Sequence, residues 1–313
     1  MEIEEVSFKE FDNVFNNSYF IFGSGKFNNL NKDKVKKVYY FLFKEKKYRL
    51  GLVIGEKDNI LKSPFSAPFG GFLFLSTDIK IEYIEFAVDL LINWAKKHSI
   101  NKIQITMPPT MYNETFISKQ INTLYRKGFV LNTIELNYAI FLENTELSSL
   151  NYLSRAARKN LNISKNSNLR FVKGKSNQEF NEAYQIISKN RASRGYPLRM
   201  TWEQVYETSK VLQADSFLVR YEEEVIVASA IVFHVNKEVA QVIYWGDIPE
   251  YSNFKVMNFL AHELFSYYKE KGIKVVDVGP STENSIPNYG LCDFKESIGC
   301  SVSQKISMVL DLK

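Results

Sequence analysis

The chain has 313 residues, of which 45% are hydrophobic and 24% are charged, and its formal net charge is +5. This composition excludes a disordered or collagen-like chain. The small positive excess argues against a general DNA-binding protein but permits an anionic ligand. At roughly 150 residues per domain, the length favours two domains.

The two cysteines, Cys292 and Cys300, are too few for a disulfide framework or a four-thiolate zinc site. Since no cluster of metal ligands is visible in the sequence either, we expect no metal. The opening residues MEIEEVSFKEF lack a basic segment followed by an apolar one, and every long apolar run is interrupted by charge. We therefore expect no signal peptide, no transmembrane segment and a cytoplasmic protein. The many Lys, Asn and Ile residues favour a bacterial source.

The first half opens irregularly to about Lys34 and then alternates strands with helices. Two β-rich runs within 37–56 flank a Lys-Glu-Lys turn, which predicts a hairpin. The apolar spacing of 81–98 is typical of an amphipathic helix. We also expect a strand at 72–75, a strand at 102–106, a helix at 113–127 and a long strand at 129–142.

The second half begins with a predicted helix at 148–165. Ser176 with Glu179, and Thr201 with Gln204, have the spacing of capping boxes and predict helices at 176–190 and 202–213. The remaining predicted elements are strands at 215–221, 224–234 and 238–246, a helix at 254–271, a strand at 274–278, a helix at 291–298 and a strand at 301–311.

The two halves share one order of elements. A strand begins at Ile100 after KKHS and at Ile273 after KEKG, and Gly128 and Gly299 each end the helix that follows. The nearly constant offset favours a duplicated fold with domains at 1–147 and 148–313. The alternative is the ordinary alternation of elements in α/β proteins.

The order of elements over 176–311 resembles the GNAT acyltransferase fold, and several segments resemble its Fem-type (FemAB-like) branch. The matching segments are YLSRAARKNLNISK, RASRGYP, VIYWGD, VVDVGPS and GLCDFKESIG. The last is similar to the Gly…Phe-Lys…Gly pattern before the final strand of Fem-type enzymes. The resemblance implies an α/β (α+β) fold of tandem GNAT-like domains, each a mixed central sheet flanked by helices. The first domain would be a degenerate copy, and the second would carry the chemistry.

The sequence departs from CoA-dependent GNAT enzymes at the start of the long helix. Those enzymes carry a Gly-rich turn there, whose backbone N–H groups hold the CoA pyrophosphate. Here residues 251–258 contain no glycine. Ser252 and Asn253 are the candidate cofactor-binding residues, or else helix caps. The departure fits Fem-type enzymes, which use aminoacyl-tRNA, although the coiled-coil arm of some Fem enzymes is absent here.

Three residues are candidates for catalysis. In the resembling family, the lysine at the position of Lys295 lies near the acyl carbonyl, where an ammonium can stabilise the developing oxyanion. Asp247 could accept a proton from the attacking amine, and Tyr289 could act as general acid for the leaving group. The alternatives are a solvated lysine beside Glu296, and a structural tyrosine on a surface loop.

A second set of residues could bind the substrate. Aromatic side chains could hold a sugar ring or an acyl chain, guanidinium groups could bind phosphate or carboxylate, and an amide could supply a polar contact. These candidates are Tyr244, Trp245, Phe294, Arg191, Arg194, Arg199 and Asn284. Core packing, capping and ion pairing are the alternatives.

Two further features are charged. A basic stripe on the helix at 148–165 could meet a diphosphate or a tRNA backbone, or it could be a solvated face; its residues are Arg155, Arg158, Lys159, Asn162 and Lys165. Asp277 lies within an apolar strand, where an unpaired carboxylate would be costly. We expect it to orient a cation or to cap a turn.

The sequence thus predicts an N-acyltransferase of cell-envelope biosynthesis. It would transfer an acyl group from a thioester such as acetyl-CoA or another acyl-CoA to an amine of a small or glycan-precursor substrate. The acyl-CoA would be a co-substrate, with no permanently bound cofactor. One alternative is Fem-type transfer from aminoacyl-tRNA to a peptidoglycan-like precursor. The other is a non-catalytic binding protein on the same fold.

Overall fold

A computed structural model describes residues 1–16, 19–222 and 224–312. Packing divides them into two compact units. Unit 1 comprises Met1–Leu136, Thr282–Ile286 and Ser303–Lys313, and unit 2 comprises Asn137–Ser281 and Pro287–Val302. The boundaries fall within β7 (Val130–Phe141) and β15 (Ser301–Asp311), so two long strands contribute to both units. The division into domains after residue 147 stays a prediction.

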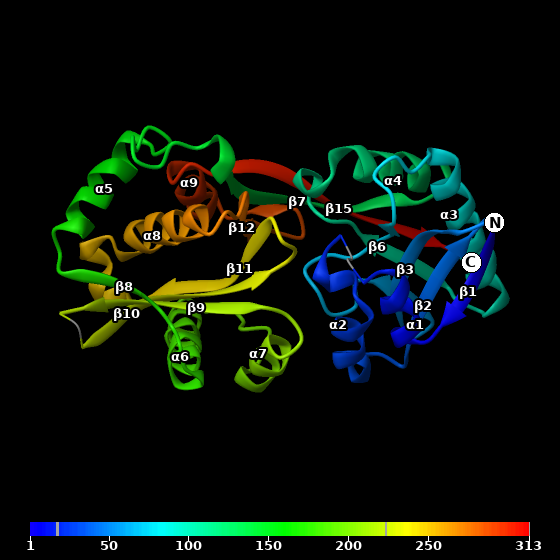
Figure 1. The fold of residues 1–313 in the computed structure, drawn as a ribbon, viewed down its shortest axis with the longest axis horizontal. Coiled ribbons are helices and arrows are strands. Elements are labelled where there is room, and N and C mark those ends of the chain that lie inside the picture. Colours follow the sequence, from blue (N-terminus) through cyan, green and yellow to red (C-terminus); the bar gives the residue numbers. More distant parts are fainter. Residues whose placement is uncertain (17–18, 223, 313) are drawn as a thin grey trace. The chain divides into compact units, whose positions relative to one another are not determined.

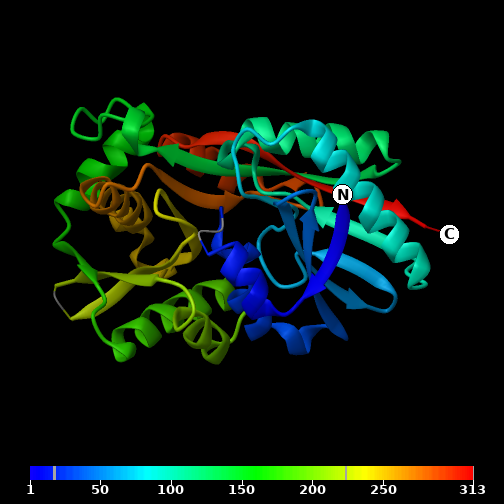
Figure 2. The ribbon, with the colours of Figure 1, turned by 45° about the vertical axis from the view of Figure 1, so that its right-hand side comes forward.

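Unit 1 is a mixed sheet flanked by helices. Its strands pair in the order β1 (Glu2–Val6), β2 (Lys37–Lys44), β3 (Tyr48–Lys57), β4 (Ile60–Ser63), β6 (Lys102–Thr106) and β15, and β5 (Leu73–Phe74) pairs with β3. Among these pairings of the described residues, the β4–β6 pairing alone is parallel. Helices α3 (Ile81–Lys97) and α4 (Glu114–Arg126) lie side by side (Figure 1, Figure 2). Their buried residues share one apolar cluster with the strands.

The opening of unit 1 differs from the prediction. The hairpin β2–β3 and helices α3 and α4 are confirmed within a residue or two. Residues before Lys34, however, form β1, α1 (Phe8–Val14) and α2 (Gly25–Leu30) rather than an irregular segment. These elements are too short for a clear periodicity, but Ser7 and Glu10 form a capping box at α1.

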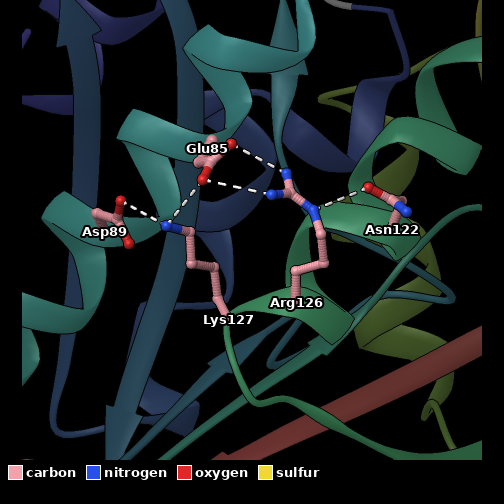
Figure 3. Close-up of polar contacts among 5 residues, drawn as sticks. All are labelled: Glu85, Asp89, Asn122, Arg126 and Lys127. Carbon is pink, nitrogen blue, oxygen red and sulfur yellow. Dashed lines mark hydrogen bonds and ion pairs between the residues drawn. The ribbon is translucent and has the colours of Figure 1, made fainter.

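Ion pairs join α4 to α3 in unit 1 (Figure 3). Arg126 lies 2.9 Å from a Glu85 carboxylate oxygen, and it also donates to Asn122. Lys127 pairs with Glu85 at 3.0 Å and with Asp89 at 2.8 Å. Hydrogen bonds from Arg126 and Lys127 lower the pKa of Glu85. These exposed pairs orient the two helices and contribute little stability each.

Unit 2 is also a mixed sheet flanked by helices. Its strands pair in the order β7, β12 (Val275–Pro280), β11 (Val239–Asp247), β10 (Val225–His234), β9 (Ala214–Tyr221) and β8 (Leu169–Lys173). Figure 1 shows α8 (Val256–Glu270) and α9 (Tyr289–Ser297) on one face of this sheet, and α6 (Asn177–Ser193) and α7 (Trp202–Ser209) on the other. Helix α5 (Arg155–Lys165) packs against α8. Short strands β13 (Thr282–Glu283), which belongs to unit 1, and β14 (Ile286–Pro287) pair with each other before α9.

Several predicted boundaries in unit 2 are wrong. The helix expected at 148–165 begins only at Arg155, because Leu150 has a positive φ of 57° and the Ser154 side chain caps the helix. Strand β8 was not expected, and α7 ends at Ser209 rather than 213. Helix α9 begins at Tyr289, two residues early. Both predicted capping boxes are confirmed.

Candidate active site

The parallel strands β11 and β12 pair over only three residues. Val239–Gln241 lies opposite Val275–Asp277, and β11 then continues to Asp247 without β12 beside it. We call this point the fork. An unpaired strand edge presents N–H and C=O groups that an extended ligand can bind. The fork is therefore a candidate place for an extended ligand in unit 2.

A buried carboxylate organises the fork. Asp277 accepts hydrogen bonds from Asn137 Nδ2 at 2.8 Å, Gln241 Nε2 at 2.7 Å and the Gly279 N–H at 2.8 Å. Gly279 has a φ of +74° beside a register shift in β12, a conformation that favours glycine. Of the two roles expected for Asp277, the structure shows turn capping.

Lys295 lies directly against this turn. It is 2% exposed, and its Nζ donates to the carbonyl oxygens of Gly279 at 2.8 Å and Pro280 at 3.0 Å. An ammonium has three N–H groups, so one is left without an acceptor among the described residues. The Asn288 side chain caps α9, the helix that carries Lys295. The alternative of a solvated surface lysine is wrong.

The surroundings of Lys295 make its ammonium group a stronger acid than that of an ordinary lysine. Burial is the main cause that lowers the pKa of Lys295 to about 8; the positive charge of Arg191 acts in the same direction, and Cys300 and Asp277 act against it. Burial raises the pKa of the Cys300 thiol to about 12, so Cys300 is no nucleophile at neutral pH. Lys295 is thus charged at neutral pH but close to losing its proton.

Asp247 lies at the end of β11 and is buried. Its Oδ1 accepts hydrogen bonds from Asn190 Nδ2 at 3.0 Å and from Arg194 Nη2 at 3.2 Å. Among the described residues, no donor is bound to its Oδ2. Gly246 makes this packing possible, because a Cβ there would lie 2.7 Å from Asn190 Cγ. One carboxylate oxygen is fixed and the other stays available to a proton.

Arg191 adds a second cation near Lys295. Its buried Nε has no hydrogen-bond partner in the part of the chain that the structure describes. Burial lowers its pKa, while Tyr244 and Tyr196 oppose the effect. A buried donor without a partner is costly, so this group suits an anionic or carbonyl ligand. Of the other two predicted arginines, Arg194 pairs with Asp247 and Arg199 is exposed.

The predicted aromatic residues do not form one platform. Neighbouring strand residues point to opposite faces. Trp245 packs edge-to-face with Phe294 of α9, with ring centroids 6.0 Å apart. Tyr244 is buried toward α6, near Arg191 and Tyr184, and burial raises its pKa.

Four other candidates lie away from this cluster. Tyr289 is 75% exposed at the start of α9. Asn284 belongs to unit 1. Ser252 and Asn253 are exposed in the 3-10 helix η5 (Pro249–Phe254), just before α8. Their roles as ligand-binding or catalytic residues stay predictions.

The loop before α8 lacks glycine and bonds part of its own backbone. The Lys255 N–H donates back to the Ser252 carbonyl at 3.0 Å, so this N–H group is not free to hold a ligand. Lys255 is the N-cap residue and has no side-chain capping bond, so the alternative of capping by Ser252 or Asn253 is wrong. The rings of Phe254 and Tyr221 stack at 5.0 Å beside this turn.

Three residues of the site were missed in the sequence. The Asp277 carboxylate is held by Gln241 and Asn137, and the Asp247 carboxylate is held by Asn190. The side-chain amide oxygens of Gln241 and Asn137 are buried and have no hydrogen-bond partner among the described residues. The signal was present: each is a polar residue within an apolar strand or helix face, as Asp277 is.

Comparison with known proteins shows which solved structures share this fold. No protein-family model matches the chain, and no curated protein sequence matches it. Among solved structures, FemX is 13% identical with a TM-score of 0.73, over 99% of this chain and 97% of FemX. L-PGS from Bacillus licheniformis is 12% identical with a TM-score of 0.63, over 97% of this chain and 92% of L-PGS. A tandem GNAT protein from the clavulanic acid biosynthesis pathway is 8% identical with a TM-score of 0.55, over 100% of this chain and 98% of that protein.

The chain has a tandem GNAT-like fold of the FemX type. This confirms the expected fold class, since these likenesses cover nearly the whole chain. At such low identity they show the fold alone. In the described part of the chain, no helix combines the length and apolarity needed to cross a membrane.

Proposed function

We propose that the protein is an N-acyltransferase of Fem type, which transfers an aminoacyl group from aminoacyl-tRNA to an amine of a small or glycan-precursor substrate. The observation that carries the proposal is Lys295, a buried ammonium with one N–H group to spare beside the fork. Burying such a charge is costly, and a binding site for developing negative charge gives it a use.

The chemistry needs few groups. The amine nitrogen attacks the ester carbonyl carbon, and negative charge develops on the carbonyl oxygen, which Lys295 stabilises. As the intermediate collapses, the C–O bond to the tRNA ribose breaks and the C–N bond of the amide remains. Asp247 Oδ2 takes the proton from the amine, and the leaving ribose oxygen takes a proton from water. Alignment of the two substrates supplies much of the rate.

The turn before α8 favours an ester donor over a CoA thioester. A CoA pyrophosphate needs backbone N–H groups in close approach, and η5 bonds its own Lys255 N–H to Ser252. The likeness to FemX and L-PGS is also higher than the likeness to the tandem GNAT protein. Transfer from acyl-CoA is the second candidate, supported by the likeness to that tandem GNAT protein, whose structure is described as one without AcCoA.

The test is a donor comparison. Purified protein is incubated with UDP-linked glycan precursors or simple amines, and with either a radiolabelled mixture of aminoacyl-tRNAs or radiolabelled acetyl-CoA. We expect an amide product with the tRNA donor. Deacylated tRNA and free CoA are the controls. A product with acetyl-CoA alone would establish the second candidate, and no product with either donor would favour a non-catalytic binding protein.

A further inference from the structure

Helix α5 is unusually basic. Its eleven residues, RAARKNLNISK, include four cations and no acid. Ala157 and Leu161 are buried against unit 2, whereas Arg155, Arg158 and Lys159 are exposed. We call these three exposed side chains the α5 basic face.

The α5 basic face has no counter-charge. Within the residues that the structure describes, none of the three side chains forms an ion pair with a carboxylate. Arg155 is the first residue of the helix, and Arg158 lies in its first turn. The positive end of the helix dipole disfavours cations there. An anionic ligand would relieve both effects.

The α5 basic face starts next to the candidate active site. The Ser154 N–H, just before α5, donates to the Ser297 carbonyl oxygen at 2.9 Å. Ser297 ends α9, two residues after Lys295. At 1.5 Å per residue, α5 extends about 16 Å, and it lies beside α8 (Figure 1). A polyanion joined to the reacting carbonyl could therefore pass from Lys295 onto α5.

We infer that the α5 basic face binds the sugar-phosphate backbone of the RNA that carries the acyl group. This inference rests on the proposed function. Arginine and lysine provide the sequence-independent phosphate contacts of RNA-binding proteins, and the exposed Asn162 amide on the next turn can add a hydrogen bond. A membrane surface fits less well, because Ala157 and Leu161 are buried and Ile163 is the one large apolar side chain that the described part of α5 exposes, at 38%, which is a small anchor for lipid.

The experiment compares two triple variants of equal charge. The first is Arg155→Gln, Arg158→Gln and Lys159→Gln. The control replaces three exposed lysines elsewhere in unit 2, Lys175, Lys189 and Lys237, with Gln. Affinity for tRNA is measured by fluorescence anisotropy at several salt concentrations. We expect the α5 variant to bind about tenfold or more weakly and its salt slope to fall by about 2, while the control keeps the wild-type slope. An α5 variant that binds tRNA like the control overturns the inference.

A second readout separates this inference from the proposed function. Transfer is measured from charged tRNA and from an aminoacylated dinucleotide, which is too short to reach along α5. We expect the α5 variant to lose far more activity with tRNA than with the dinucleotide. Wild-type protein that binds tRNA through α5 but transfers from neither donor would overturn the proposed function and leave the RNA surface standing. If the α5 variant instead loses binding to phosphatidylglycerol vesicles and keeps its tRNA affinity, the face binds membranes and the inference is wrong.

Discussion

Helix α4 in unit 1 and helix α9 in unit 2 hold corresponding places in the order of elements, each just before a long strand, but one buries an apolar side chain and the other a charged one at the same distance from the helix end. Each ends at a glycine with positive φ, 89° at Gly128 and 88° at Gly299. Four residues before that glycine, unit 1 has Leu124 and unit 2 has Lys295, exposed by 0% and 2%.

The backbone around this position is the same in both units. The N–H that follows each glycine donates back to this residue, from Phe129 to Leu124 and from Cys300 to Lys295, each at 3.1 Å. The equal geometry means that the backbone at the helix end does not distinguish the two sites, whereas the side chain does.

The strands beside these helices also differ. In unit 1, β4 and β6 stay paired along all of Ile60–Ser63, and Leu124 lies within the apolar cluster. In unit 2, the equivalent strands part after Gln241 and Asp277. Proteins depart from good packing where function requires it. Unit 1 thus uses the position for stability, and unit 2 uses it for a charge.

The largest effect is expected from making unit 1 like unit 2. Leu124→Lys places an ammonium in a cluster with no prepared acceptors, and an uncompensated buried charge costs about 3–5 kcal/mol. We expect a large fall in the free energy of unfolding, measured by urea denaturation. Leu124→Met, which keeps the volume, should cost less than about 1.5 kcal/mol. Equal stability of the two variants would show that unit 1 can also accommodate a charge there.

The reverse change, a leucine at position 295, is expected to lower transfer activity while the protein stays folded. Lys295→Leu deletes the oxyanion donor, and loss of one such donor lowers the rate about 10²–10³-fold. The change leaves the carbonyls of Gly279 and Pro280 without their donor, at about 1–3 kcal/mol, but it also relieves the cost of the buried charge. We therefore expect transfer activity to collapse while the melting temperature shifts only slightly. A folded Lys295→Leu protein with full activity would remove Lys295 from the mechanism.

The contrast between the units shows what the sequence could reveal. Local signals were sufficient for the capping boxes at Ser176 and Thr201, and for Gly128 and Gly299. Lys295 was recognised only through its resemblance to a family pattern, because nothing local distinguishes a buried lysine from a solvated one. The fold itself followed from the order of the elements.

The sequence marked the polar residues of the fork by their apolar surroundings, but it could not show which of them meet. The three residues that form the polar network of the fork, Asn137, Gln241 and Asp277, lie on three different strands, so they come together only in the tertiary structure. The same is true of Arg194 and Asp247, which lie 53 residues apart in sequence. The opposite orientation of Tyr244 and Trp245, by contrast, follows from strand alternation and was predictable.

The smallest expected effect is a pH dependence that belongs to unit 2 alone. Because the pKa of Lys295 is lowered to about 8, its charge is lost as the pH rises through that value. If the charge is what stabilises the oxyanion, activity should fall about tenfold per pH unit above 8. The pH profile of kcat/KM checks this. In Lys295→Arg, whose guanidinium stays charged, the decline near pH 8 should vanish from the residual activity. Activity that rises through pH 8 would instead make the neutral amine a base.

Stability should change in the opposite direction over the same pH range. The folded pKa of Lys295, about 8, lies below its ordinary value of 10.5, so the unfolded chain binds more protons between these values. The penalty for burying the charge is fully present below pH 8 and is relieved as the pH rises toward 10.5, by up to about 3 kcal/mol. The difference in unfolding free energy between wild type and Lys295→Leu isolates this contribution, because other titrating groups cancel.

Leu124→Met, compared with wild type in the same way, should show no such pH dependence, because unit 1 buries no charge at that position. A flat difference for Lys295→Leu as well would mean that the folded protein does not disfavour the charged lysine.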